Sequence, residues 1–358
     1  MKKKFIIAIS LCLALCAGNV FTAFATTMVT TEVVDPVAEF LNRDESEKPV
    51  DSSEPEIIPT VSLSYRVVDY SNITITGCEP TLDGKFIIPE RLSVSIRGKD
   101  YSIPVTKIGP HAFEACRDIT GIEIPKTVTY IDNYAFNLCT RLKYANIPTT
   151  VSYIGERAFG SCKSLESIEI PVGVSAIQDK TFFSCWSLKD VVIPSTVSRI
   201  GDYAFSECVS LMNIKLPETV SKIDSYAFSQ SGLTSIKIPK SVKSIGSQAF
   251  YACVMLSEVT IPDDGDFLGI GYETFYGCTS LKAINIPATT VVIGYRAFLL
   301  DTDIVVTCKE NSYVERYCHE NNISFQKVGS MSWIVDRYKN RNFAIPNPEY
   351  TVNDLGLN

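Results

Sequence analysis

The sequence predicts a repeat solenoid in which short parallel strands stack coil upon coil. The first observation is a recurring Ala-Phe or Thr-Phe pair, with steps of 23, 23, 23, 23, 23, 22, 25 and 23 residues. The phenylalanines are Phe113, Phe136, Phe159, Phe182, Phe205, Phe228, Phe250, Phe275 and Phe298. The second observation is a strand-like segment that ends in proline once in every unit. A fixed period of this size is typical of stacked-coil proteins, in which each coil buries its apolar face only against its neighbours.

One complete unit, residues 151–171, justifies each element in turn. Its segment 165–170 predicts one parallel strand per coil of about 23 residues, because Ile168 and Ile170 are two apart and share a face. Proline follows the strand and ends its hydrogen bonding: Pro125, Pro148, Pro171, Pro194, Pro217, Pro239, Pro262 and Pro287. Turns and short helical segments complete the coil, and 151–154 is a second short extended stretch. Gly155 lets the chain bend, but other units carry Asp or Gln there, so a positive φ is not required.

The N-terminus indicates export. Lys2, Lys3 and Lys4 precede an apolar run, and Ala23-Phe24-Ala25 resembles a cleavage site, so residues 1–25 are predicted to be a signal peptide. No later run reaches about 18 apolar residues, which predicts no membrane span. The chain's net charge is −7, and removing three lysines without any acid makes the mature chain more acidic. Such a protein is expected to be secreted or extracellular, either released or associated with the cell surface, and to avoid nucleic acid.

The remaining boundaries follow from composition and period. Residues 26–59 are predicted to be a disordered acidic linker, because they are rich in acids, Thr, Ser and Pro. Residues 60–104 alternate apolar and polar side chains and predict a strand-rich N-terminal cap. Eight repeats occupy 105–289, and a partial ninth repeat with a helical C-terminal cap occupies 290–328. Residues 329–358 form a tail without a clear period.

Two units depart from the common length. The unit that contains Phe228 is one residue short near Gly232 and has Ser231 where cysteine is usual. The next unit gains two residues at 263–266, which predicts an exposed acidic loop because insertions in solenoids fall on loops.

The string Ile-Gly-x-x-Ala-Phe-x-x-Cys-x-x-Leu-x-x-Ile-x-Ile-Pro closely resembles the BspA-type leucine-rich repeat family, over residues 105–298. Members of that family are typically exported or surface proteins with roles in adhesion and in binding partner molecules. The resemblance implies a leucine-rich repeat solenoid without catalytic residues. Proline follows the strand and no asparagine ladder is present, so the resemblance does not imply a regular horseshoe curvature.

The residue types expected of an enzyme are scarce. The chain has two histidines, His111 in a variable repeat position and His319 in the predicted cap helix, and no nucleophile-elbow motif accompanies either. Asp263, Asp264 and Asp266 lack the spacing of a calcium hand. The sequence therefore predicts no catalytic residue, no cofactor and no metal ligand.

The cysteines follow the repeat. Seven lie three residues after a repeat phenylalanine: Cys116, Cys139, Cys162, Cys185, Cys208, Cys253 and Cys278. Stacked, buried free thiols are the favoured interpretation. Disulfides between adjacent coils and metal binding are the alternatives. Cys308 and Cys318 flank the predicted helix and could pair.

The outward face of the strands is the predicted ligand-binding surface. Its candidate residues are polar and mixed in charge: Tyr144, Asn146, Glu169, Asp190, Asn213, Lys215, Lys237 and Glu258. Because the face is poor in exposed aromatic side chains, a protein or cell-surface ligand is favoured over a carbohydrate. Lys215 and Lys237 stand on adjacent coils, where like charges repel, and an acidic segment of the partner is hypothesised to lie across them.

Three functions fit these observations. The first is an exported, non-enzymatic repeat protein that binds a protein or cell-surface ligand through the strand face. The second is a structural spacer module of a surface assembly, for which the same face is merely solvated. The third is an exported hydrolase, whose paired carboxylates would need a cleft that a solenoid does not offer.

Overall fold

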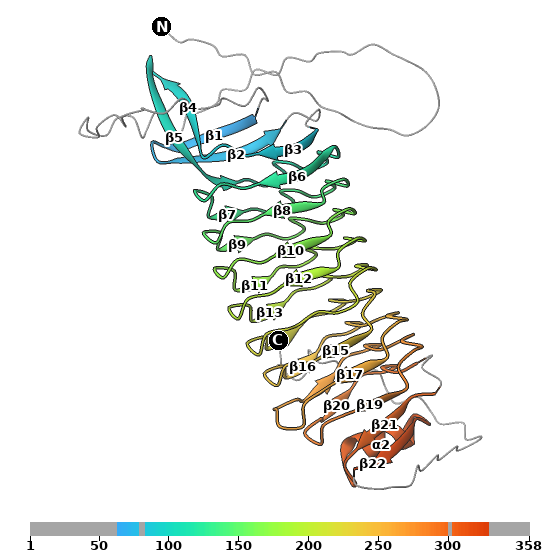
Figure 1. Cartoon of the computed structure of the whole chain (residues 1–358). Helices are drawn as coiled ribbons and strands as arrows, with labels where there is room; N and C mark the ends of the chain where they lie inside the picture. The colour runs from blue at the N-terminus through green and yellow to red at the C-terminus, as the bar shows by residue number, and fades with distance from the viewer. Residues whose placement is uncertain (1–62, 79–82, 300–302, 329–358) are drawn as a thin grey trace, which may run out of the picture. The chain divides into compact units, whose positions relative to one another are not determined.

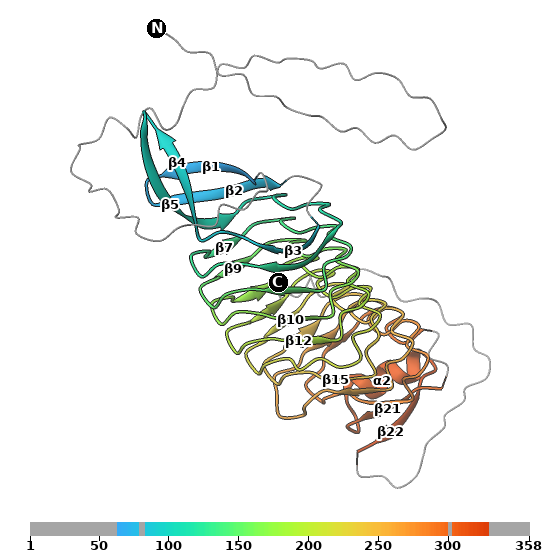
Figure 2. The same cartoon turned by 45° about the horizontal axis from the view of Figure 1, so that its top comes forward.

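The computed structural model describes residues 63–78, 83–299 and 303–328, and the predicted signal peptide, acidic linker and tail lie outside them. These residues form a parallel β-solenoid whose coils follow one another along the stack, as predicted (Figure 1). The coils keep this arrangement when the molecule is turned (Figure 2). Every coil except the one that contains residues 213–215 carries two short strands rather than the single strand that the sequence predicted, because the stretch that includes 153–154 also pairs with its neighbours.

The two-residue strands form the more continuous ladder. They are β7 (Tyr130–Ile131), β9 (Tyr153–Ile154), β11 (Ala176–Ile177), β13 (Arg199–Ile200), β14 (Lys222–Ile223), β16 (Ser244–Ile245), β18 (Gly269–Ile270) and β20 (Val292–Ile293). Strands β11, β13, β14, β16, β18 and β20 make one unbroken six-stranded parallel sheet. The second residue of each of these strands is a buried isoleucine, so Ile200 pairs with Ile223 and Ile223 pairs with Ile245.

The strand before each proline forms the second ladder, whose outward side chains we call the strand face. Its strands are β6 (Ile119–Glu123), β8 (Tyr144–Asn146), β10 (Ser167–Glu169), β12 (Asp190–Val192), β15 (Ser235–Lys237), β17 (Glu258–Thr260), β19 (Ala283–Asn285) and β21 (Val305–Cys308). This ladder is divided into separate sheets of two or three strands. Residues 213–215 form no strand, so this ladder is interrupted between β12 and β15.

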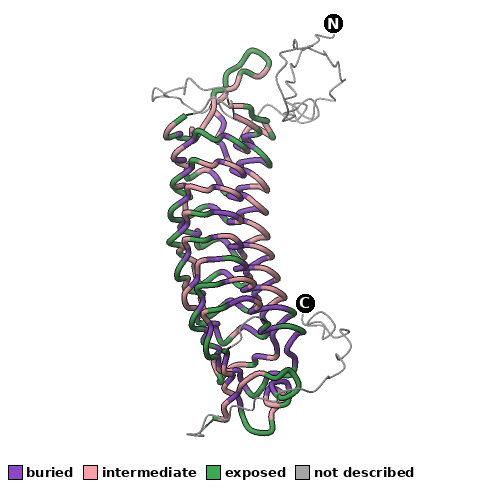
Figure 3. Tube along the Cα trace, turned by 90° about the vertical axis from the view of Figure 1, so that its right-hand side faces the viewer, coloured by how far each residue is buried: buried purple, intermediate pink, exposed green. Residues whose placement is uncertain are grey.

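The phenylalanine column lies in the interior, as predicted. Phe113 through Phe275 have no exposed surface and Phe298 is 5% exposed. Neighbouring rings stack with centroid separations from 5.1 Å (Phe113–Phe136) to 5.9 Å (Phe159–Phe182). Buried residues recur in every coil along the stack (Figure 3). The coil-to-coil hydrogen bonds also run through this column, since the Phe159 amide donates to the Thr181 carbonyl at 3.0 Å.

The turns around each phenylalanine use left-handed residues instead of the short helical segments that were expected. Arg157 (φ 51°) and Ser161 (φ 57°) flank Phe159 in this conformation, and the other coils repeat the pattern. Gly155 does not have a positive φ, which confirms the interpretation from sequence. Its role is close approach instead, because a Cβ there would lie 2.5 Å from the Asn133 amide nitrogen.

The cysteine column is buried beside the phenylalanines. Each thiol donates to the carbonyl of the phenylalanine one coil earlier, at 3.0–3.2 Å: Cys139, Cys162, Cys185, Cys208, Cys253 and Cys278. Burial raises the pKa of Cys139 and of Cys185 to about 12. The prediction of free thiols is confirmed for Cys139 through Cys253, because an S–H group there satisfies an interior carbonyl.

Two cysteine predictions need correction. Cys116 is not a free thiol, since it forms a disulfide with Cys78, which lies outside the repeat column. Cys308 and Cys318 do not pair in the structure, and both remain buried thiols. The disulfide joins the strands before the first coil to the first phenylalanine unit.

The strands that precede the repeats are β1 (Leu63–Asp69), β2 (Asn72–Cys78), β3 (Gly84–Ile87), β4 (Arg91–Ile96) and β5 (Lys99–Ile108). β1 pairs with β2 and β4 with β5 in antiparallel fashion, while β2 and β5 start the parallel ladder. At the other end α2 (Tyr313–Glu320) lies between β21 and β22 (Ser324–Lys327). Ser312 caps α2 by accepting from the Glu315 amide, and Val314, Tyr317 and Cys318 bury its inner face.

Candidate ligand-binding face

The structure places the predicted site residues on the strand face, on successive coils. Those that are exposed are Asn146, Glu169, Asp190, Asn213, Lys215, Lys237 and Glu258. Tyr144 is half-buried because its ring lies over Gly121 of the preceding coil, where a Cβ would be 2.3 Å from the Tyr144 Cζ atom. Parallel pairing fixes the columns, with Ser167 opposite Asp190 and Ser235 opposite Glu258.

The early coils are less acidic than the sequence suggested. Glu123 pairs with the Lys85 ammonium at 2.8 Å and accepts from the Asn146 Nδ2 at 2.7 Å. These two contacts, the lysine first, lower the pKa of Glu123. Its charge is thus compensated within the strand face, whereas Glu169 forms no ion pair with any residue in the described ranges.

A groove interrupts the strand face in the middle of the array, and we call it the central groove. It lies between residues 213–216 and residues 235–237, is bordered by Glu218, and has a volume of about 270 Å³. Lys215 and Lys237 both line it. No backbone hydrogen bond joins 213–216 to either neighbouring coil, although both neighbours are described.

The short repeat unit borders the central groove. From Phe228 to Pro239 the chain has one residue fewer than from Phe205 to Pro217. The missing residue falls beside Gly232, whose Cβ would lie 2.1 Å from the Val209 carbonyl oxygen. Only glycine permits this shortcut, and the segment that follows it keeps the register of the other coils, since the Thr234 amide donates to the Met212 carbonyl at 2.9 Å. The short unit was visible in the sequence, but the absence of a strand at 213–215 was not predicted.

The core is less completely covered beside residues 213–216. Inward side chains of this column are nearly fully buried elsewhere, as at Ile168 (4% exposed) and Ile284 (2%). Ile214 is only partly buried, and so are Val191 and Ile193 of the coil before it. Among the apolar residues that line the central groove, Ile214 is the partly exposed one, because Leu216 (6% exposed) and Ile236 (3%) are buried.

Exposed apolar side chains occur in the same two coils, and also in other coils, as at Val254 (52% exposed) and Met255 (55%). Trp186 is 45% exposed, Val192 58%, Val209 56% and Met212 58%. The Lys163 ammonium lies 3.9 Å from the centroid of the Trp186 ring. Sequence reasoning missed these residues because it examined only the two outward strand columns. The signal was an apolar residue directly after Cys185 and Cys208, a place that is polar in earlier units.

The central groove is basic at its rim. Lys237 contacts Glu218 at 3.8 Å, with both side chains more than half exposed, so this pair contributes little. Lys215 has no ion-pair partner within the described part of the chain. The Ser235 hydroxyl donates to the Asn213 Oδ1 at 3.3 Å across the groove. The charge of Lys215, which has no such partner, and the charge of Lys237, which is weakly compensated, therefore border the apolar lining of the groove.

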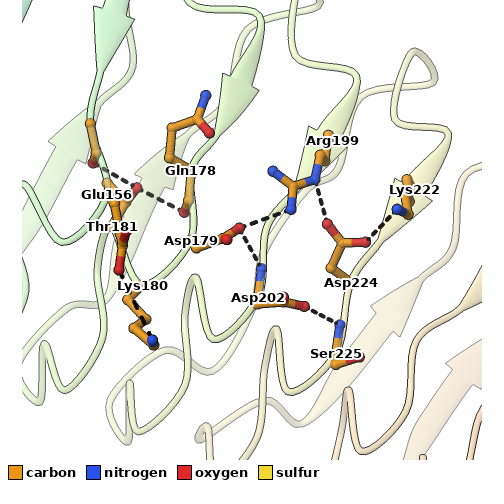
Figure 4. A network of polar contacts seen from close by, with 11 residues as sticks. Glu156, Gln178, Asp179, Lys180, Thr181, Arg199, Asp202, Lys222, Asp224 and Ser225 are labelled. Carbon is orange, nitrogen blue, oxygen red and sulfur yellow. Dashed lines mark hydrogen bonds and ion pairs between the residues drawn. The ribbon is translucent and has the colours of Figure 1, made fainter. Parts of the chain in front are cut away.

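A separate polar network lies along the other ladder and compensates its own charges (Figure 4). Arg199 contacts Asp224 and lies 2.8 Å from Asp179, and Lys222 lies 3.2 Å from Asp224. Burial, followed by the neighbouring carboxylates, raises the pKa of Asp202. Its carboxylate accepts from the Ser225 amide at 2.8 Å. This network links successive coils and is structural.

The residue types that the sequence singled out for catalysis or metal binding can be placed in the described ranges. No group of three or more His, Cys, Asp or Glu side chains could hold a metal ion in the ranges that the structure describes. His111 and His319 are exposed and contact Glu114 and Glu315. No helix within those ranges is long and apolar enough to cross a membrane.

The repeat defines the class of protein. The family model for the BspA type leucine-rich repeat region matches six copies over residues 106–233 and 175–305, which is more than half of the chain. The chain belongs to the BspA-type leucine-rich repeat family. A search of curated proteins found no match.

Several solved structures are similar to the chain. A leucine-rich repeat protein from Bacteroides ovatus shares 23% identity, covering 74% of this chain and 98% of its own, with a TM-score of 0.38. A leucine rich cell surface protein from Faecalibacterium prausnitzii shares 24%, covering 76% and 96%, with a TM-score of 0.37. The T. pallidum leucine-rich repeat protein shares 26%, covering 61% and 87%, with a TM-score of 0.42.

Proposed function

We propose that this protein is an exported, non-enzymatic repeat protein that binds a protein or cell-surface ligand through its strand face. The observation that carries the proposal is the central groove, which lies on the strand face and is lined by the exposed Lys215 and Lys237. Family membership supports an interaction role, and the signal-like N-terminus supports export outside the cell.

A spacer role is the alternative, and the compensated early coils favour it. Glu123, Lys85 and Asn146 satisfy one another, as on a face that meets only water. A spacer would tolerate every outward substitution on the strand face. A binding protein would lose its ligand when the central coils change.

The test uses residues 26–358 as bait on bacterial and host surface extracts. Captured proteins are compared between the wild type, Lys215→Glu with Lys237→Glu, and the control Lys99→Glu with Lys309→Glu. The control makes the same change in charge at exposed sites away from the strand face. We expect a specific ligand to be captured by the wild type and the control but not by the strand-face variant. Equal capture by all three proteins would remove the strand face as the binding surface.

A further inference from the structure

The central groove has features that define its occupant more closely than the strand face as a whole. We infer that it docks an extended protein segment that inserts one large apolar side chain and places carboxylates beside it. This inference deepens the proposed function and rests on it, because it assigns one place on the strand face and the chemistry of the partner.

The apolar side chain of the occupant is inferred from residues 213–216, which form no strand and leave Ile214 partly exposed. Ile214 is only partly buried, and Leu216 and Ile236 also line the groove. Apolar surface that remains open to water gains free energy when a partner covers it. Val192 and Met212, exposed by 58% each, lie outside the groove lining. A partner side chain that fills the groove would cover the exposed part of Ile214.

Charge complementarity specifies which residues of the partner segment flank its inserted apolar side chain. Lys215 has no ion-pair partner within the described residues, and Lys237 has only the exposed Glu218 at 3.8 Å. Carboxylates on both sides of the inserted side chain would meet these ammonium groups. A basic partner would be repelled by both.

The size of the central groove points to a side chain as its occupant. Its volume of about 270 Å³ lies below the roughly 300–1,000 Å³ of pockets that enclose drug-sized molecules. It is open on the strand face, where a chain running across the coils has access. The volume suits one aromatic or large aliphatic side chain with the backbone passing over it.

The test measures fluorescence polarisation of three labelled heptapeptides with residues 26–358. The probes are Gly-Asp-Asp-Phe-Asp-Asp-Gly, the same peptide with Ser for Phe, and the same peptide with Lys for every Asp. We expect the acidic phenylalanine peptide to bind at least about tenfold tighter than the serine peptide, because only phenylalanine fills the groove. The lysine peptide should not bind, and salt should weaken the acidic complex.

Two variants locate the binding. Ser235→Trp fills the central groove from its rim and should remove binding of the phenylalanine peptide, while Ser167→Trp on an intact strand should leave it unchanged. Lys215→Glu with Lys237→Glu changes only exposed side chains and should remove binding without affecting the fold. Urea unfolding checks that each variant is folded.

The outcomes separate this inference from the proposed function. Equal affinity for the phenylalanine and serine peptides, with loss only in the lysine double variant, would overturn the groove and keep a charged strand-face site. Binding that survives both the tryptophan and the lysine variants would overturn the strand face as well. No binding of the acidic phenylalanine peptide to the folded wild type would overturn the assigned chemistry of the partner.

Discussion

Removing one ring from the phenylalanine column is the most direct test of what stabilises the stack. Phe159 has no exposed surface and stacks on Phe136 at 5.2 Å and on Phe182 at 5.9 Å. Phe159→Ala deletes the ring and both stacking contacts. Neighbouring coils cannot collapse into the space, because hydrogen bonds from coil to coil fix their separation.

The magnitude follows from these contacts. Burial of a phenylalanine side chain contributes about 1.5–3 kcal/mol, and each aromatic pair adds about 0.5–1.5 kcal/mol. Together they predict a loss of about 3–5 kcal/mol in the free energy of unfolding, which agrees with the usual cost of Phe→Ala in a packed core. Phe298 stacks only on Phe275 within the described residues, so Phe298→Ala should cost about 1 kcal/mol less.

The assay is urea unfolding followed by circular dichroism and by tyrosine and tryptophan fluorescence. Coincident transitions justify a single free energy of unfolding, which is a necessary check for a repeat protein. Val192→Ala, at a 58% exposed site, is the control and should stay within about 0.5 kcal/mol of the wild type. A loss below about 1 kcal/mol for Phe159→Ala would refute the stacked-ring account of stability.

Three further predictions concern the thiols and the short unit. Burial raises the pKa of Cys185 to about 12, so the stabilisation that it contributes is complete below pH 9 and is lost from there towards pH 12. The free energy of unfolding, measured with urea between pH 8 and pH 10.5, should fall as the pH rises. Cys185→Ala should reduce this slope by about 1.4 kcal/mol per pH unit above pH 9, and an unchanged slope would contradict the burial of Cys185. Peptide mapping of unreduced protein should find Cys78 linked to Cys116, and recovery of both as alkylated thiols would exclude that bond. Gly232→Ala should lower the free energy of unfolding by about 1–3 kcal/mol, because its Cβ would lie 2.1 Å from the Val209 carbonyl oxygen; unchanged stability would contradict this close approach.

The sequence predicted the repeating parts of the fold because one physical demand recurs in every coil. Phe159 must be buried between its neighbours, and Pro171 must end a strand, so both could be assigned without coordinates. The second ladder was harder to predict, because two residues such as 153–154 are too short to give a period. The disulfide between Cys78 and Cys116 was missed because Cys116 occupies a repeat position whose other members are thiols.

The candidate site was predicted in part. The outward columns followed from the alternation of side chains along a strand, and Lys215 and Lys237 were singled out correctly as neighbours. The central groove could not be predicted, because residues 213–216 keep the sequence pattern of the strand although they form none. Gly232 marks the shortcut only once the Val209 carbonyl is known to lie against it.

The short unit and the central groove leave the stack itself intact. Phe228 still stacks on Phe205 at 5.5 Å and on Phe250 at 5.4 Å. On the other ladder β14 still pairs with β13 and with β16, in the same register as elsewhere. The coils on both sides of residues 213–216 are therefore held by the core and by the opposite sheet. The central groove thus lies on a face whose supporting framework does not depend on strand pairing at 213–216.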